Sequence, residues 1–160
     1  IIKHSGYKCI SIGENSDEPL ILNSVLVGCA IWVEGKDSST PIILNTVFAK
    51  NGIGVHAYQK KEIFGGANVT IANSIFTENQ EDVHADPGSK VTVTYSALST
   101  LHDGSGNITT APLFVGSLGG DYRLLPGAPE SFSQGGDFET LKKYVPSYHL
   151  ESAPIGLWNE

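Results

Sequence analysis

The sequence predicts an all-β protein with the architecture of a parallel β-helix, and three observations support this prediction. A short apolar phrase containing Asn recurs as ILNSVLVGC, ILNTVFAKNG and IANSIFTEN. The phrases show no helical period of about 3.6 residues. Most equivalent positions lie about 22 residues apart, a repeat length at which stacked coils bury one continuous core.

An Asn residue marks the same place in each phrase. Asn23, Asn45 and Asn73 are separated by steps of 22 and 28 residues, and apolar residues recur in register around them. Asn tolerates the left-handed backbone of a sharp bend, and its amide can hydrogen-bond the equivalent amide of the next coil. We therefore expect these three residues to form an internal ladder at one corner of the coils.

Two weaker copies extend the repeat in both directions. In VTVTYSALST, Tyr95 falls in the Asn column, and near the N-terminus Ile10 falls in the column of Ile31. The longer step comes from an insert around YQKKEIFGGAN, which we expect to form a loop. Residues 1–110 are therefore predicted to form a solenoid of about four coils of roughly 22 residues.

The C-terminal part, residues 111–160, is predicted to be a cap and side cover on the same body. Strands on either side of Gly119-Gly120 should form a pair that is folded back by a glycine turn. Asp137 is placed to N-cap a short helix that Pro146 ends. A last coil without such a cover would expose an unpaired sheet edge, which promotes aggregation.

The composition limits the partners of the chain. Its net charge of −7 disfavours binding to nucleic acids and to anionic membranes. No apolar run approaches the roughly 20 residues that span a bilayer, so no membrane span is expected. The sequence contains no Met, and its apolar start lacks a signal-peptide pattern, so we expect a processed or excised piece of a longer protein.

Strand alternation provides the first candidate for a binding residue. If Ile31 and Val33 face inward, Trp32 and Glu34 face outward. An exposed indole is a flat apolar platform on which a sugar ring can stack, while nearby acids bind its hydroxyl groups. The interpretation that we favour is that the C-terminal tail covers Trp32, because an exposed Trp is costly.

A second outward column contains titratable residues. Glu34, His56 and His84 occupy equivalent places in three coils, and two imidazoles with a carboxylate are a known zinc ligand set. Because a flat strand face holds its side chains parallel rather than convergent, we expect solvated histidines and no metal. Asp82, which is also a ligand-binding candidate, or Asp86 would offset the charge of protonated rings.

The two cysteines occupy nearly the same place in adjacent coils. Cys9 and Cys29 lie one residue out of register in the repeat, so they are expected to be neighbours. We favour free thiols in a buried column over the alternative, a disulfide of an exported protein.

Catalytic residues cannot be assigned from the pattern. A polysaccharide lyase needs a strong base and a calcium-binding cluster of acids, but Arg123 is the only arginine and is expected to form a structural ion pair. A glycosidase needs two carboxylates about 5 to 9 Å apart in a cleft. Glu81, Asp82 and Asp86 are close in sequence, yet Asp86 begins an Asp-Pro-Gly run that is typical of a turn.

Three stretches carry a resemblance to a known family. These are NSIFTEN with the following VHAD, APLFVGSLGGDYRLLPGAP, and the terminal APIGLWNE. Together they resemble the right-handed parallel β-helix repeat proteins of the pectate-lyase-like superfamily, which are mostly secreted or surface-attached bacterial proteins. The resemblance implies a right-handed β-helix and an extracellular or cell-surface location.

The functional expectation follows from these observations. We expect a non-catalytic C-terminal part of an exported or cell-surface β-helix protein that offers a rigid face to a polysaccharide or other surface glycan and stacks on upstream coils. The alternative is a polysaccharide lyase or glycosidase whose active coils lie largely upstream of residue 1. No cofactor is expected, except calcium if the protein is a lyase.

Overall fold

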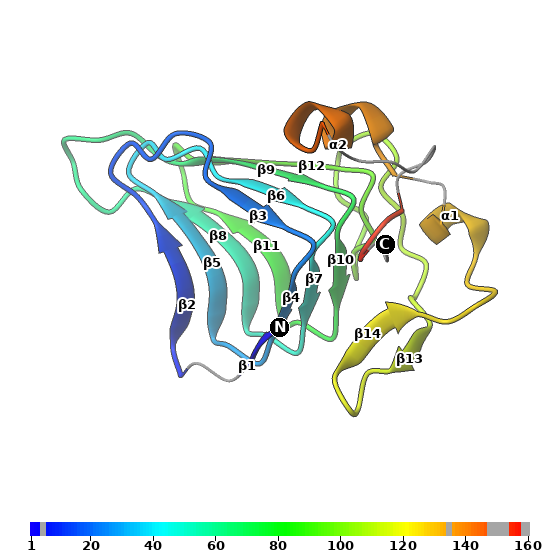
Figure 1. The fold of residues 1–160 in the computed structure, drawn as a ribbon. Coiled ribbons are helices and arrows are strands. Elements are labelled where there is room, and N and C mark those ends of the chain that lie inside the picture. Colours follow the sequence, from blue (N-terminus) through cyan, green and yellow to red (C-terminus); the bar gives the residue numbers. More distant parts are fainter. Residues whose placement is uncertain (4–5, 134–135, 147–153, 158–160) are drawn as a thin grey trace.

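The protein is mostly β-structure, arranged in three four-stranded parallel sheets (Figure 1). The computed structural model describes residues 1–3, 6–133, 136–146 and 154–157. The β1 sheet contains β1 (Ile2–Lys3), β4 (Val25–Val27), β7 (Val47–Ala49) and β10 (Ile75–Thr77). The β2 sheet contains β2 (Lys8–Ile12), β5 (Ile31–Lys36), β8 (Ile53–Tyr58) and β11 (Glu81–Ala85). The β3 sheet contains β3 (Leu20–Leu22), β6 (Ile42–Leu44), β9 (Asn68–Ala72) and β12 (Lys90–Thr94).

The chain visits the three sheets in a repeating order and adds one strand to each sheet at every pass. The register confirms most of the predicted columns, because Ile43 pairs with both Ile21 and Ile71. The first step was predicted wrongly, since Ile10 pairs with Val33 and not with Ile31. The predicted insert lies in the loop between β8 and β9, as its sequence indicated.

The main core lies among the three sheets. It contains apolar residues from successive passes of the chain, and among them Phe48 and Phe76 form an aromatic pair. Their rings stack with centroids 4.7 Å apart and planes only 2° from parallel. Because the two residues are register partners in β7 and β10, the repeat itself produces this stack.

The Asn column has the predicted backbone but not the predicted partners. Asn23, Asn45, Asn73 and Tyr95 all have φ between 45° and 54°, which confirms a left-handed bend in every copy. The amides do not form the expected ladder at Asn45 and Asn73. Asn45 Nδ2 instead donates to the carbonyl oxygens of residues 154 and 156, at 2.8 and 2.9 Å, and Asn73 Nδ2 donates to the carbonyl of residue 137. These bend residues therefore hold the C-terminal segment.

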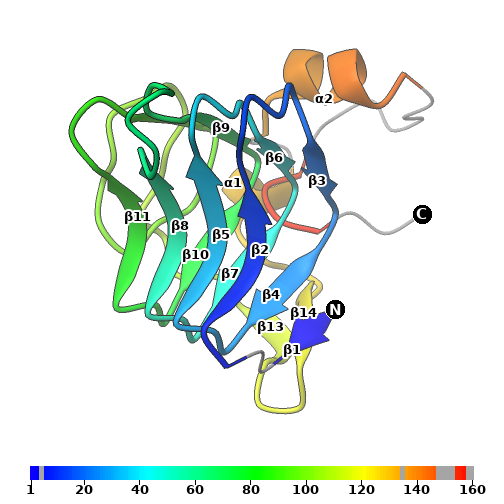
Figure 2. The ribbon, with the colours of Figure 1, turned by 90° about the vertical axis from the view of Figure 1, so that its left-hand side faces the viewer.

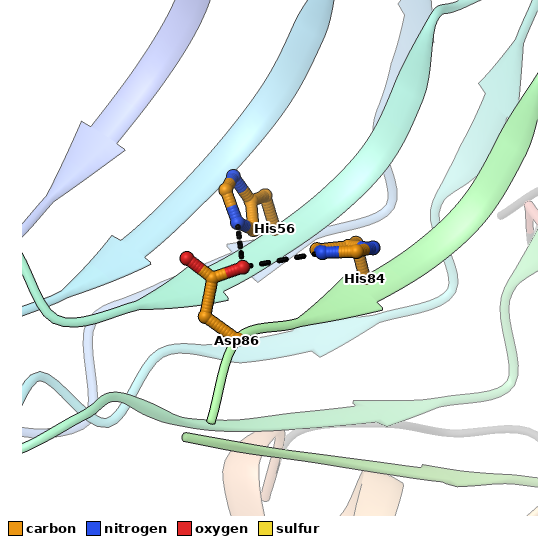
Figure 3. Close-up of side chains that lie close together, drawn as sticks. All are labelled: His56, His84 and Asp86. Atoms are coloured by element: carbon orange, nitrogen blue, oxygen red, sulfur yellow. Dashed lines mark hydrogen bonds and ion pairs between the residues drawn. The ribbon is translucent and has the colours of Figure 1, made fainter. Parts of the chain in front are cut away.

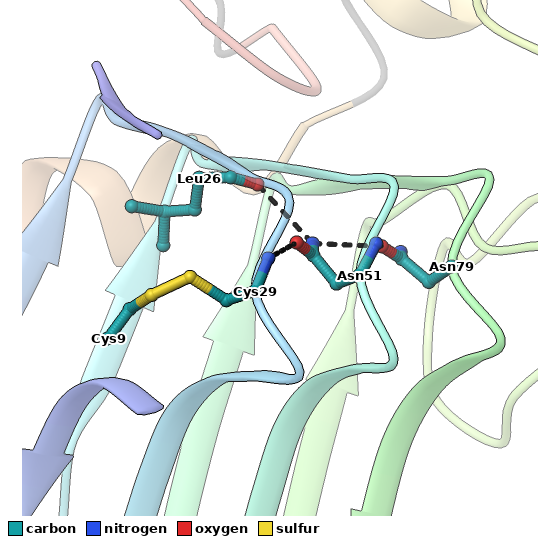
Figure 4. Close-up of a disulfide and its surroundings, with 5 residues drawn as sticks. All are labelled: Cys9, Leu26, Cys29, Asn51 and Asn79. Carbon is teal, nitrogen blue, oxygen red and sulfur yellow. Dashed lines mark hydrogen bonds between the residues drawn. A yellow bond between two sulfur atoms is a disulfide. The ribbon is translucent and has the colours of Figure 1, made fainter. Parts of the chain in front are cut away.

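Two other polar columns connect successive passes. Asn51 Nδ2 donates to Asn79 Oδ1 at 2.9 Å, and Asn51 Oδ1 accepts from the backbone of Cys29 (Figure 4). A column of hydroxyls follows the bend residues, in which Ser74 Oγ accepts from the backbone N–H of Thr46. Ser96 Oγ accepts in the same way from the backbone of Ser74. The internal amide ladder thus exists, but at a different position from the predicted one.

The C-terminal segment forms the predicted local elements. Strands β13 (Phe114–Gly116) and β14 (Asp121–Leu124) pair antiparallel, and helix α2 (Phe138–Tyr144) follows its N-cap Asp137, whose side chain accepts from the backbone N–H of Thr140. A further short helix, α1 (Glu130–Ser133), was not predicted.

The C-terminal segment covers the sides of two sheets (Figure 1). Tyr122, Phe132 and Ile155 form a second apolar cluster with the outward residues of the β1 sheet. Leu141 of α2 packs against outward residues of the β3 sheet in a third cluster. Among the described residues, no helix has the length and apolar character that a membrane crossing requires.

Candidate functional site

The outer face of the β2 sheet differs from the other two because none of the described C-terminal elements packs on it. Figure 2 shows this sheet facing the viewer, with the helices and the β13–β14 pair behind it. Its register places Ser11, Glu34, His56 and His84 in one row across the four strands. The predicted column of Glu34, His56 and His84 is therefore confirmed, with Ser11 as its fourth member.

Trp32 does not face outward, so its prediction as a ligand platform is wrong. It is fully buried in the same core cluster as its neighbour Val33. A Cβ placed on Gly54, one repeat later, would lie 3.0 Å from the ring of Phe76, so this position faces the core in both strands. Two successive residues thus point inward, which strict strand alternation does not allow. The main core buries Trp32, rather than the C-terminal tail that we favoured.

Glu34 faces outward but is covered by its neighbours. Its side chain is 1% exposed and forms an ion pair with Lys8, while Ser11 Oγ donates to its Oε2 at 3.0 Å. Lys36 Nζ lies 3.9 Å from the same oxygen. Burial opposes ionisation of Glu34, but the hydrogen bonds from Lys8 and Ser11 outweigh it and hold its pKa below the ordinary value. The negative charge of Glu34 is therefore compensated by Lys8, and the residue has a structural role rather than being accessible to a ligand.

The two histidines converge on one carboxylate, contrary to the expected parallel arrangement (Figure 3). His56 Nε2 and His84 Nε2 each lie 3.1 Å from Asp86 Oδ1. The rings meet edge to face, with centroids 5.1 Å apart. His84 Nδ1 lies 2.8 Å from Glu81 Oε1. Sequence reasoning named Asp86 as a charge partner, and the turn that follows β11 brings it back over both rings.

The same contacts set the charge of the cluster. The hydrogen bond to Glu81 is the main cause that raises the pKa of His84 above its ordinary value. The hydrogen bond from His56 is the main cause that lowers the pKa of Asp86. On the same face, the ring of Tyr58 stacks on His56 at a centroid distance of 4.8 Å, and Lys8 Nζ lies 5.7 Å from the Tyr58 ring.

Asp82, the remaining ligand-binding candidate, lies outside this row and is held by internal hydrogen bonds. It is 9% exposed, and its carboxylate accepts from the backbone N–H of Ser99 at 2.7 Å and from Asn79 Nδ2 at 3.0 Å. These bonds connect β11 to the segment that follows β12. Asp82 also lines a cavity of about 220 Å³ together with His102 and neighbouring residues. Its carboxylate is already engaged by internal donors on both oxygens.

The cysteines are joined, so the favoured prediction of free thiols is wrong. Cys9 and Cys29 form a disulfide across 20 residues of sequence (Figure 4). Cys9 lies beside the core cluster that contains Cys29. The predicted register of the first pass was wrong, but both cysteines face the same interior and can therefore meet.

Arg123, the remaining charged candidate, pairs with a residue of its own strand. Arg123 contacts Asp121 through two side-chain hydrogen bonds of 2.9 and 2.6 Å within β14, as the expected structural ion pair. The side-chain hydrogen bond from Arg123 is the main cause that lowers the pKa of Asp121 to about 2. Arg123 is mostly exposed, and the ion pair that the structure describes for it lies within its own strand.

Comparison with known proteins gives no further guide to the site. No protein-family model, curated protein or solved structure matches this chain.

Proposed function

We propose that this chain is a right-handed parallel β-helix of an exported or cell-surface protein, and that the outer face of its β2 sheet contacts a glycan or a comparable surface. The repeated order of the three sheets, with one parallel strand added at each pass, supports the β-helix. The right-handed sense follows the general preference of parallel crossover connections and the family resemblance of the sequence.

The disulfide supports an exported protein. Disulfides such as Cys9–Cys29 persist in oxidising compartments and are rare in the reducing cytosol. The bond joins two successive passes of the chain, so it stiffens the N-terminal end of the stack. A rigid scaffold outside the cell is the role that this combination suits best. The bacterial origin that the resemblance implies remains a prediction.

One observation carries the choice of surface: of the three sheets, only the β2 sheet keeps an outer face of polar and aromatic side chains that no described C-terminal element covers. Tyr58, His56 and His84 present rings there, and Lys8 and Asp86 present charges. Ring faces beside hydrogen-bonding groups are what sugar rings need for stacking and orientation. Trp32 has no part in this proposal because it is buried.

The test is a screen of the chain against acidic and neutral polysaccharides, with and without calcium. Binding should depend on the β2 sheet, so Tyr58→Ala should weaken it at least tenfold. The control is Leu118→Ala, which changes an almost fully exposed side chain in the turn of the β13–β14 pair. Equal binding by the two variants, or no binding by the native chain, would contradict the proposal.

The same screen addresses the alternative, a polysaccharide lyase or glycosidase. New unsaturated or reducing ends would indicate cleavage and replace the binding proposal. The engagement of Glu34 and Asp82 by internal donors supports a structural role for these acids and is the reason that we place the alternative second.

A further inference from the structure

The convergence of His56, His84 and Asp86 on the uncovered face has a chemical consequence of its own. One nitrogen from each ring and one carboxylate oxygen all lie within 4.8 Å of one another. Two imidazoles and a carboxylate are a ligand set for zinc and related transition metals, whereas calcium and magnesium prefer oxygen ligands. We propose that these three residues form a binding site for a divalent transition metal of the zinc type.

The backbone fixes the three ligands. His56 of β8 and His84 of β11 are register partners on adjacent parallel strands, which brings their side chains together. Asp86 follows β11 by one residue, and its N–H donates to the carbonyl of Ala57 at 2.9 Å. The turn closes with a bond from the N–H of Ser89 to the Asp86 carbonyl. The ligands therefore come from paired backbone and not from a free loop.

For a metal to bind, the main adjustment is to the distance between the two ring nitrogens, which is within 4.8 Å. In a tetrahedral zinc site, bonds of about 2.0–2.1 Å put neighbouring ligand atoms about 3.3–3.4 Å apart. Both ring nitrogens already lie 3.1 Å from the Asp86 oxygen. Rotation of the His84 and Asp86 side chains can make this adjustment, because each is 42% exposed. Three protein ligands leave one position of the metal open on the outer face.

Glu81 supplies the outer contact that metal-bound histidines usually have. Its Oε1 lies 2.8 Å from His84 Nδ1. When Nδ1 carries the proton and donates to Glu81, the Nε2 lone pair is free to bind a metal. His56 has no such support, because its buried Nδ1 has no hydrogen-bond partner in the described part of the chain. Glu81 therefore acts as a positioning residue for His84 alone.

The open position on this metal would face the surface that we propose for glycan contact, but the metal site does not rest on that proposal. It follows from the geometry of three side chains and is tested without any polysaccharide.

The experiment is a calorimetric Zn²⁺ titration of the untagged chain, with Co²⁺ absorption as a probe of nitrogen and oxygen ligation. The expected result is one specific site per chain that excess Ca²⁺ and Mg²⁺ do not occupy. Asp86→Asn and His84→Gln should each weaken binding at least tenfold. Glu81→Gln should weaken it about tenfold while leaving the Co²⁺ spectrum of the loaded site unchanged.

The matched control is His102→Gln, which changes a partly exposed histidine on another loop. This variant should bind Zn²⁺ like the native chain. Circular dichroism checks that every variant keeps its fold. No zinc binding by the folded native chain, or binding that survives both Asp86→Asn and His84→Gln, would overturn the proposal.

Discussion

The outer face of the β2 sheet and those of the other two sheets come from the same repeat but carry different side chains. In the β1 sheet, register partners such as Val25, Val47 and Ile75 point apolar groups outward, and the C-terminal segment packs on them. In the β2 sheet, the outward row reads Ser11, Glu34, His56 and His84. Residue choice at the outward positions therefore decides which face is covered and which remains available to a partner.

The largest expected effect comes from removing a side chain that packs the C-terminal segment on the β1 sheet. Phe132→Ala removes a fully buried ring that packs on the β1 sheet, so it should lower the free energy of unfolding by about 3–5 kcal/mol. Tyr58→Ala, on the uncovered face, should cost less than half as much. Urea denaturation of both variants makes the comparison, and equal losses would show that the two faces are not different.

The next effect concerns the N-terminal end of the stack. Cys9→Ala with Cys29→Ala removes a cross-link between residues 20 positions apart in sequence, so unfolding should cost about 3 kcal/mol less. Reduction of the native chain should have the same effect, and a reductant should not change the double variant. A native chain whose melting temperature is the same with and without reductant would refute this prediction.

A smaller effect distinguishes the backbone strain at the Asn73 bend from the hydrogen bonds that Asn73 makes to the C-terminal segment. Asn73 has φ 54°, and its side chain exchanges hydrogen bonds with the backbone of Asp137. Asn73→Gly keeps the backbone freedom and should lose about 1 kcal/mol with the amide contacts. Asn73→Ala should lose at least about 1 kcal/mol more, because Ala disfavours the left-handed region. Thermal unfolding measures both, and equal values would mean that the bend carries no strain.

The smallest effect is a pH dependence on the uncovered face. Because the folded-state pKa of Glu34 lies below the ordinary 4.5, its ionised form stabilises the fold at pH values above 4.5. That contribution should be lost as the pH falls below 4.5 through the folded-state pKa. The stability difference between the native chain and Glu34→Gln should therefore shrink in this range. A difference that stays constant from pH 7 to pH 3 would contradict the account.

The sequence predicted the backbone better than the side chains. The bend residues, the β8–β9 insert, the glycine-turned strand pair and the helix N-cap at Asp137 all follow from local chemistry, and all are confirmed. Trp32 was misplaced because two successive residues of β5 face the core, and nothing in the local pattern marks that change.

The row of residues in the candidate site could be predicted from the sequence, but the contacts around that row could not. Register alone brought Glu34, His56 and His84 into one row. The closure of Asp86 over both rings depends on the turn after β11, and the burial of Glu34 depends on Lys8 from another pass. The His56–Asp86 and Lys8–Glu34 contacts join different passes of the chain, so a column pattern cannot predict them.

The central claim is that the outer face of the β2 sheet carries the binding site. Its most direct test is amide chemical-shift mapping of the isotope-labelled chain during Zn²⁺ addition. The account predicts shifts at His56, His84 and Asp86 and their neighbours on β8 and β11, with the covered β1 and β3 sheets unchanged. Shifts centred on His102 or on the C-terminal segment, or none at all, would contradict it.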